Sequence, residues 1–344
     1  MKKVAIIGPC GEGPEYITGQ GVKTLATVKW MRRRFGEDSV ITVNTRGWKR
    51  HPFRMVFSVI RAVRCAQNIL LLPAQHGIRV FPRLLVLANR FFRRRLFLLV
   101  IGGWLADHVR QSPSLKRVLS RFDGVCAETE SLASRLRDAG LPRAWYLPNF
   151  RDSVPGDLYE RSMVPPLRVC TFSRVTETKG IRDAVEICRR ANATLGSTVF
   201  LLDIYGPVDS GFAREFEELC RQEADMVRYC GVCGVDEAGT VLREHFALLF
   251  PTYYEGECFA GTALDAFLWH LPILASDWKY NHEVIHDGVN GFLFPARDTA
   301  RAAGLLVRLS RDRELYLSIQ DGCRKSAEVY SSDRVLEKLV KEMV

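Results

Sequence analysis

The sequence lacks an apolar run long enough to cross a membrane. Its longest run, LFLLVIGGWLA at 96–106, has about half the length that a transmembrane helix requires. The amino terminus, MKKVAIIGPCGEG, is typical of a strand followed by a loop and not of a signal peptide. We therefore expect a soluble cytoplasmic protein, or one that lies on the inner face of the cell membrane.

Patterns for metal binding and for disulfides are also missing. The ten cysteines include one Cys-x-x-Cys, formed by Cys230 and Cys233, but no second pair follows it at zinc spacing. No Asp-x-Asp occurs, so the chain offers no obvious carboxylate pair for a divalent cation. These absences favour free thiols in a reducing compartment, with neither a metal nor a cofactor.

Charge is unevenly distributed along the chain. Residues 1–165 carry 28 Lys+Arg and 12 Asp+Glu, whereas residues 166–344 carry 21 and 27. A basic half attracts anionic partners such as nucleic acid, acidic lipid head groups or a lipid diphosphate. The alternative is a set of solvated helix faces. The basic residues are spread over the half-chain without a recognised nucleic-acid motif, so nucleic acid is not an expected partner.

Short apolar runs alternate with amphipathic stretches from end to end. This alternation predicts an α/β protein built from right-handed βαβ units and doubly wound parallel sheets. The predicted strands are Val4–Ile7, Val40–Val43, Ile69–Leu72, Leu96–Ile101, Val125–Ala127, Trp145–Leu147, Arg168–Phe172, Val199–Tyr205, Val227–Tyr229, Ala247–Phe250, Ile273–Ala275 and Phe292–Phe294. The predicted helices include Gly21–Phe35, Phe81–Arg94, Ile181–Arg190, Phe212–Glu223, Glu237–Glu244 and Thr262–His270, with two or three more after Asp298.

The length of 344 residues favours two domains. The stretch from Pro148 to Pro166 interrupts the alternation with four prolines and is the predicted linker. We expect domains at 1–155 and 156–325, followed by a helical segment at 326–344 that packs back toward the first domain. Two facing doubly wound domains leave a cleft at the carboxyl ends of their strands, where ligands usually bind.

Two cations follow the first strand of the second domain. Arg174 and Lys179 lie on the turn between a strand that ends at Phe172 and a helix that begins near Gly180. In this position they can converge on one diphosphate, which Arg binds bidentately and Lys neutralises as a point charge. The alternative is salt bridging at the surface to neighbouring acids.

A second strand-to-helix turn carries two acids. Glu257 precedes a helix that opens at Gly261 and Thr262, and Asp265 lies in that helix. Carboxylates accept hydrogen bonds from ribose or sugar hydroxyls, and the backbone N–H groups around Phe259–Gly261 can bind phosphate. The alternative for Asp265 is a favourable acid near a helix N-terminus.

Further candidates lie in the first half. Gly19 and Gly21, which we expect to bind the donor, belong to a glycine-bearing loop that permits close approach to a ligand, although its spacing is not a dinucleotide fingerprint. Gly102 and Gly103 form a turn at a strand end, and His76 follows the third strand. We expect these three to contact the acceptor or the sugar. A lone histidine near a strand end is otherwise a structural residue.

These segments resemble glycosyltransferase family 4, the retaining GT-B enzymes of bacterial polysaccharide and lipid glycosylation. Four pieces carry the resemblance in this order: FSRVTETKG (172–180), DIYGP (203–207), YYEGECFAGTALDAF (253–267) with LPILASD (271–277), and EVIHDGVNGFLFP (283–295). In the first half, LLPAQHG (71–77), IGGWL (101–105) and LPNF (147–150) are similar to capsule-type members.

The resemblance implies a GT-B fold, with an acceptor-binding domain first and a nucleotide-sugar-binding domain second. Arg174 and Lys179 match the diphosphate-binding pair, and Glu257 matches the first acid of the family's pair, near the donor sugar. Asp265 matches the ribose-binding acid, which is usually the longer Glu. The base-binding stretch falls at Cys230–Gly234. The remaining implied donor-side residues are Gly206, Cys230, Gly231, Phe259, Ala260, Gly261 and Thr262; Cys258 and Ala260 depart from the usual Phe and Gly-type residues.

The implied activity is retaining, metal-independent transfer of a hexose-type sugar from a nucleotide diphosphate sugar, with UDP the expected nucleotide. The implied acceptor is a lipid-linked or polysaccharide precursor, and an anionic membrane surface is left open as a partner. Catalysis would rest on Arg174, Lys179 and Glu257, because front-face attack needs no covalent carboxylate. The alternatives are a non-catalytic nucleotide-sugar-binding subunit of a transferase complex and another GT-B enzyme, an epimerase or a phosphorylase.

Overall fold

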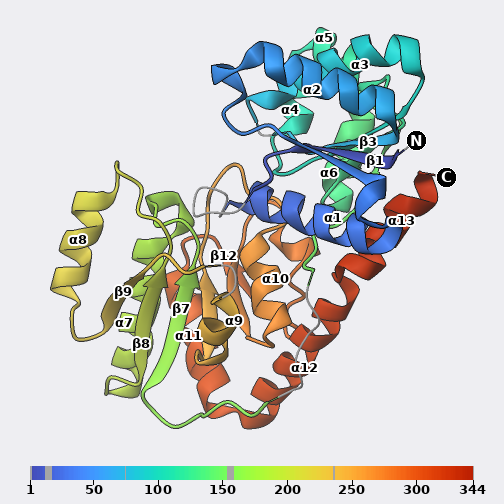
Figure 1. The fold of residues 1–344 in the computed structure, drawn as a ribbon. Helices are drawn as coiled ribbons and strands as arrows, with labels where there is room; N and C mark the ends of the chain where they lie inside the picture. Colours follow the sequence, from blue (N-terminus) through green and yellow to red (C-terminus); the bar gives the residue numbers. More distant parts are fainter. Residues whose placement is uncertain (1, 12–17, 74, 153–158, 235–236, 344) are drawn as a thin grey trace. The chain divides into compact units, whose positions relative to one another are not determined.

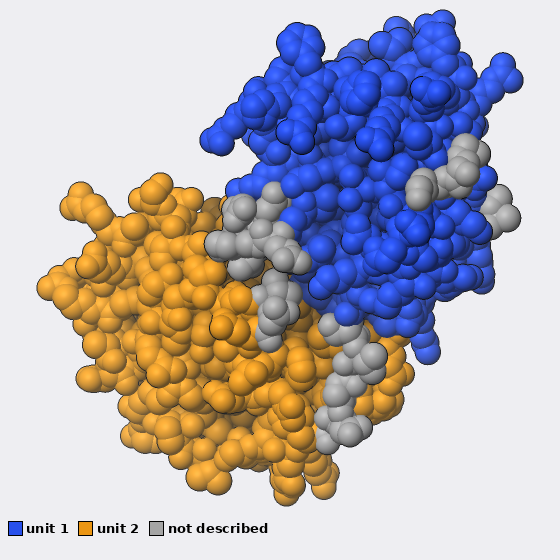
Figure 2. Space-filling view, viewed as in Figure 1, with its two compact units in different colours: residues 1–152, 330–344 blue, residues 153–329 orange. Residues whose placement is uncertain are grey.

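The computed structural model describes residues 2–11, 18–73, 75–152, 159–234 and 237–343. The chain divides into two compact units, which Figure 2 distinguishes by colour. Unit 1 comprises residues 1–152 and 330–344, and unit 2 comprises residues 153–329. The predicted domain boundary at 155/156 lies outside the described residues.

Each unit is built on one six-stranded parallel sheet. In unit 1 the spatial order is β2 (Val40–Asn44), β1 (Lys2–Gly8), β3 (Ala66–Leu71), β4 (Arg95–Leu99), β5 (Gly124–Ala127) and β6 (Ala144–Tyr146). In unit 2 it is β12 (Gly291–Pro295), β11 (Ile273–Asp277), β10 (Ala247–Phe250), β7 (Leu167–Phe172), β8 (Phe200–Tyr205) and β9 (Val227–Gly231). Every predicted strand overlaps an observed one, and the predicted doubly wound α/β class is confirmed.

Helices flank both sheets (Figure 1). Unit 1 contains α1 (Gly19–Phe35), α2 (Pro52–Cys65), α3 (Phe81–Phe92), α4 (Leu105–Gln111), α5 (Pro113–Leu119), α6 (Glu130–Asp138) and α13 (Ser332–Glu342), with short 3₁₀ turns η2 (Glu37–Ser39), η3 (Trp48–Arg50) and η4 (Gly77–Arg79). Unit 2 contains α7 (Ile181–Leu195), α8 (Ala213–Gln222), α9 (Ala238–Arg243), α10 (Gly261–Leu268), α11 (Thr299–Arg311) and α12 (Arg313–Val329), with η5 (Glu177–Lys179) and η6 (Asn281–Glu283).

In unit 1, α1 and α2 lie on opposite faces of the sheet (Figure 1). The core on the α1 side includes Met31 of α1 and Leu339 of α13, both fully buried. The indole of Trp30 on α1 also donates a 2.6 Å hydrogen bond to Asp333 on α13. The last helix of the chain therefore completes the core of the first unit by covering apolar side chains of α1.

The strand order of unit 2 determines where its ligand crevice lies. From β7 the chain continues through β8 and β9 on one side of the sheet and then returns to β10, which pairs with the other edge of β7. The order therefore reverses between β7 and β10. In open α/β sheets, ligands bind at the carboxyl ends of the strands beside such a switch point. The loops that follow β7 and β10 flank it.

Candidate functional site

The loop after β7 is held directly against the loop after β10. Gly180 has a φ of +74°, and a Cβ placed on it would lie 2.1 Å from the carbonyl oxygen of Pro251. The backbone N–H of Tyr253 donates a 2.8 Å hydrogen bond to the carbonyl of Thr178. Only glycine tolerates both the positive φ and this contact, so Gly180 allows the two loops to meet.

Lys179 and Glu257 form an ion pair across these loops. Lys179 Nζ lies 2.5 Å from Glu257 Oε2, and the two side chains are only 11% and 8% exposed. The Thr252 hydroxyl donates to the same carboxylate oxygen over 3.1 Å. A carboxylate this far from water is tolerated only when ionic or hydrogen-bond partners satisfy it. Here the Lys179 ammonium and the Thr252 hydroxyl both do so.

Arg174 joins this pair through the ring of Tyr254. The Arg174 guanidinium lies 5.4 Å from the ring centroid and the Lys179 ammonium 5.1 Å from it. Both are within the range of a cation–π interaction. Tyr254 is held in turn by the indole N–H of Trp278, which donates a 2.9 Å hydrogen bond to its carbonyl. The structure thus brings Arg174, Lys179 and Glu257 together, with Arg174 the exposed member.

The N-terminus of α10 follows Glu257 closely. Cys258, Phe259 and Ala260, all buried, separate Glu257 from the first helical residue, Gly261. The Thr262 hydroxyl is buried, and no hydrogen-bond partner reaches it within the described part of the chain. Asp265 lies in the same helix and is half-buried. A helix N-terminus with an unpaired hydroxyl is suited to binding an anionic, hydroxyl-bearing ligand.

Gly206 connects the loop after β8 to the Arg174 loop. Its φ is +133°, and an added Cβ would lie 1.8 Å from the carbonyl oxygen of Ser173. The N–H of Gly206 donates to the carbonyl of Gly231 over 2.9 Å, and the Tyr229 hydroxyl donates to the carbonyl of Gly206 over 3.0 Å. Gly206 therefore sets the backbone next to Arg174, a positioning role that needs no side chain.

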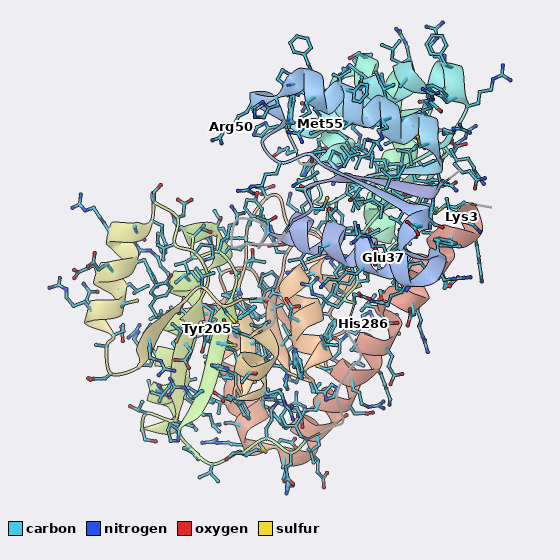
Figure 3. All side chains as sticks on the ribbon, in the orientation of Figure 1. Lys3, Glu37, Arg50, Met55, Tyr205 and His286 are labelled. Carbon is cyan, nitrogen blue, oxygen red and sulfur yellow. The ribbon has the colours of Figure 1, made fainter. Side chains whose placement is uncertain are left out.

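Cys230 and Gly231 end β9, two strands away from β7. Gly231 has a φ of +81°, and open space surrounds the position of its missing Cβ. Burial, together with the neighbouring Cys230 thiol, raises the pKa of the phenol of Tyr205, which is labelled in Figure 3 on β8. These residues lie on the β8 side of the switch point, apart from the Lys179–Glu257 pair.

The remaining candidate residues belong to unit 1. Gly19 is exposed at the start of α1, where the N–H of Gly21 donates to the capping Thr18 hydroxyl over 3.1 Å. His76 is exposed immediately before η4. The N–H of Gly102 donates to a carboxylate oxygen of Glu128 over 3.3 Å. Gly103 is buried beside it.

Two polar residues escaped sequence analysis. Glu128 follows β5 directly and forms a buried 2.7 Å ion pair with Lys23 of α1, both side chains being 2% exposed. Thr252 follows β10 after one proline and supports Glu257. Their position just after a strand was the available signal, since ligand-facing and site-supporting residues of parallel sheets gather there.

The described residues contain neither a metal-binding cluster nor a membrane-spanning helix. No group of three or more His, Cys, Asp or Glu side chains in them is arranged to hold a metal ion. No helix in the same part of the chain is long and apolar enough to span a bilayer.

Comparison with known proteins gives a consistent result. Residues 166–312 match the family model described as glycosyl transferases group 1. The amylovoran biosynthesis glycosyltransferase AmsK of Erwinia amylovora is 25% identical over 183 residues, which are 52% of this chain and 44% of that protein. The D-inositol 3-phosphate glycosyltransferase of Streptomyces bingchenggensis is 30% identical over 134 residues, which are 38% of this chain and 29% of that protein. The chain thus spans less than half the length of these two relatives.

A solved structure matches the whole chain. Anabaena Alr3699/HepE in complex with UDP and glucose superposes with a TM-score of 0.72 at 15% identity, covering 99% of each chain. At this identity the likeness shows the fold alone. Residues 166–312 therefore match a glycosyltransferase family, and the chain as a whole has the two-domain α/β fold of the GT-B glycosyltransferases.

Proposed function

We propose that the protein is a retaining, metal-independent glycosyltransferase of the family 4, capsule-biosynthesis type, with a UDP-sugar as donor. The observation that carries the proposal is the cluster of Arg174, Lys179 and Glu257 around Tyr254 at the β7/β10 switch point. Two cations at this position suit a diphosphate, and the adjoining acid suits a sugar hydroxyl. The family match over residues 166–312 supports a transferase rather than another nucleotide-binding protein.

The donor has a proposed contact at each part of the site. Arg174 and Lys179 bind the diphosphate together with the N-terminus of α10 around Thr262, and Glu257 binds a hydroxyl of the hexose. Asp265 accepts hydrogen bonds from the ribose. Cys230 and Gly231 lie beside the base, and Phe259, Ala260 and Gly261 form the wall between sugar and phosphate.

In the proposed reaction the bond between the anomeric carbon and the diphosphate oxygen breaks on the face where the acceptor hydroxyl arrives. Negative charge then grows on the departing diphosphate, and the positive charges of Arg174 and Lys179 stabilise it. The diphosphate oxygen takes the proton of the acceptor hydroxyl as the new glycosidic bond forms. The configuration at the anomeric carbon is therefore retained, and no divalent ion is required.

Relatives support the choice of substrates. UDP and glucose are bound in the Alr3699/HepE structure, whose fold covers nearly all of this chain. The AmsK relative acts in the biosynthesis of amylovoran. We accordingly propose a lipid-linked or polysaccharide precursor as acceptor, reached at the inner membrane face.

A thermal-shift panel of nucleotide sugars tests the proposal. A donor present at a hundredfold excess over its Kd adds about 2.7 kcal/mol to the free energy of unfolding, so UDP-sugars should raise Tm more than other nucleotide sugars. The Arg174→Ala variant should lose this shift, because its exposed guanidinium contributes to binding more than to the fold. Arg182→Ala, which changes an exposed arginine of α7, is the matched control and should keep it.

Two results would contradict the proposal. If no nucleotide sugar stabilises the wild-type protein, the donor site is wrong. If UDP-sugars bind but product never forms with any lipid-linked or oligosaccharide acceptor, the protein is a binding subunit of a transferase complex.

A further inference from the structure

Helix α2 carries apolar side chains on two faces. Val59, Ala62 and Val63 are buried against the sheet. On the other side lies a second apolar stripe, in which Phe53 is 89% exposed, Phe57 is 70% exposed, and Val56 and Ile60 are also exposed. Positions 53, 56, 57 and 60 follow the spacing that places side chains on one helix face. A surface helix ordinarily presents polar residues there, so this stripe needs an explanation.

Helix α3 extends the same surface. The chain passes from β2 through α2 to β3 and then through α3 to β4, always in the same direction across the sheet. Right-handed crossovers therefore put α2 and α3 on the same face of the sheet, and Figure 1 shows them together on that face. Leu87 and Phe91 of α3 are 59% and 82% exposed.

The two helices are also joined by hydrogen bonds. The Arg94 side chain, which follows α3, donates to the carbonyls of Val63 and Arg64 at the end of α2, each over 3.1 Å. We call the joint surface the α2–α3 face and define it by its exposed apolar side chains, Phe53, Val56, Phe57, Ile60, Leu87 and Phe91.

The segment that carries these apolar side chains has charges of one sign only. Residues 39–106 contain no Asp or Glu at all but twelve Lys and Arg: Arg46, Lys49, Arg50, Arg54, Arg61, Arg64, Arg79, Arg83, Arg90, Arg93, Arg94 and Arg95. On α2, Arg54 and Arg61 are seven residues apart and therefore share one side of the helix, which borders the stripe. Both side chains are exposed. Figure 3 labels Met55 in the first turns of α2 and Arg50 in η3, just before the helix. The α2–α3 face is thus apolar in its centre and cationic at its border.

The apolar centre and the cationic border together indicate which partner this face can bind. A second copy docking face to face would bring two cationic borders together, and such like-charge contacts are strongly unfavourable. An anionic lipid surface matches both features, because apolar side chains enter the boundary between head groups and acyl chains while arginines remain at the phosphates. We propose that the α2–α3 face docks on an anionic lipid bilayer. The inference deepens the membrane part of the proposed function and does not depend on sugar transfer.

Vesicle co-sedimentation of the full chain tests the inference. The wild-type protein should bind vesicles of phosphatidylcholine mixed with phosphatidylglycerol and should bind pure phosphatidylcholine far more weakly. The Phe53→Ser/Phe57→Ser variant should bind the mixed vesicles at least about tenfold more weakly, because it loses the apolar area that enters the lipid. Since both rings are exposed, Tm should not change.

A second variant measures the electrostatic part. Arg54→Gln/Arg61→Gln should bind mixed vesicles about 25-fold more weakly, at about fivefold per arginine near an anionic surface. The controls are Val289→Ser/Leu317→Ser and Arg214→Gln/Arg301→Gln, which change exposed residues of the same kinds on unit 2. Both controls should bind like the wild type.

Several outcomes would overturn the proposal. These are wild-type protein that binds neither kind of vesicle, equal binding by Phe53→Ser/Phe57→Ser and wild type, or equal loss in the unit 2 controls. A wild-type dimer that Phe53→Ser/Phe57→Ser abolishes, without vesicle binding, would assign the face to a second copy. UDP-sugar thermal shifts measured on the same variants should stay unchanged, so failure here is distinguishable from failure of the proposed function.

Discussion

The Lys179 ammonium and the Glu257 carboxylate, 78 residues apart in the sequence, meet as a nearly buried ion pair. Each comes from a loop that follows a central strand of unit 2, and Gly180 lets the two loops approach. The pair therefore links the fold of unit 2 to the proposed chemistry of its donor site.

Removing only the cation of this pair should destabilise the fold more than removing both charges. Lys179→Met leaves the Glu257 carboxylate buried without its cation, which costs about 3–5 kcal/mol. Lys179→Met/Glu257→Gln should recover most of that loss in urea unfolding. Both variants should lose transfer activity by about 100-fold or more. For the exposed pair Arg182–Glu215, Arg182→Met should cost less than about 1 kcal/mol. If Lys179→Met were as stable as the wild type, the ion pair would not contribute to the stability of the fold.

The Thr262 hydroxyl gives a cleaner separation of binding from stability. Thr262→Val removes a buried hydroxyl that has no partner among the described residues. The free energy of unfolding should be unchanged or slightly higher, since an unpaired buried hydroxyl is unfavourable. Donor affinity, measured by calorimetry, should fall about tenfold through the lost hydrogen bond. Thr171→Val is the control, because its hydroxyl is also buried and unpaired but lies within β7. Equal affinities for both variants would remove Thr262 from the site.

Gly206 should be far less tolerant than Gly231, although both have positive φ values. Gly206→Ala forces a methyl group against the Ser173 carbonyl and should cost about 3 kcal/mol through strain and overpacking. It should also shift the backbone at Arg174 and weaken donor binding. Gly231→Ala meets open space and should cost only about 1–2 kcal/mol. The comparison uses urea unfolding, and similar costs for the two would disprove the steric argument.

His270 should make stability fall in mildly acidic solution. The imidazole is buried, neither ring nitrogen has a partner within the described residues, and burial together with Arg161 lowers its pKa below the ordinary 6.5. The unfolded chain therefore binds a proton more readily than the folded protein, so the free energy of unfolding should decrease as the pH falls below about 6.5. His270→Asn suits the positive φ of +51° and cannot titrate.

The measurement is the free energy of unfolding across pH 8 to 5 for both proteins, with every other titrating group in common. The wild type should lose more stability than His270→Asn over this range. Parallel curves would mean that His270 titrates alike in the folded and unfolded states.

Transfer should persist when divalent ions are removed. The proposed mechanism places the neutralising charge on Arg174 and Lys179 and assigns no role to a metal. Dialysis against a chelator should therefore leave the initial rate unchanged, with a metal-dependent transferase assayed alongside as the positive control. Complete loss of activity that manganese restores would refute the prediction.

Local pattern was enough for much of this protein. The twelve strands were predictable because a parallel strand buried on both faces needs a short continuous apolar run, and β10 shows this with every residue buried. Arg174, Lys179 and Glu257 were identifiable as candidates because they follow strands and because their surroundings resemble a known family. Helix α2 contains an apolar stripe at exposed positions, and periodicity alone does not distinguish that stripe from the buried one.

By itself the sequence determined the α/β class, the order of the strands along the chain and the residue types of the candidate site, since these depend on short-range periodicity and turn chemistry. Only the tertiary structure decided that Lys179 pairs with Glu257, that Thr252 donates a hydrogen bond to the Glu257 carboxylate, and that Glu128 forms an ion pair with Lys23. It also decided which face of α2 meets the sheet and which meets solvent. Such pairings join segments that are far apart in the sequence, and sheet order and crossover direction bring them together, which no local pattern encodes.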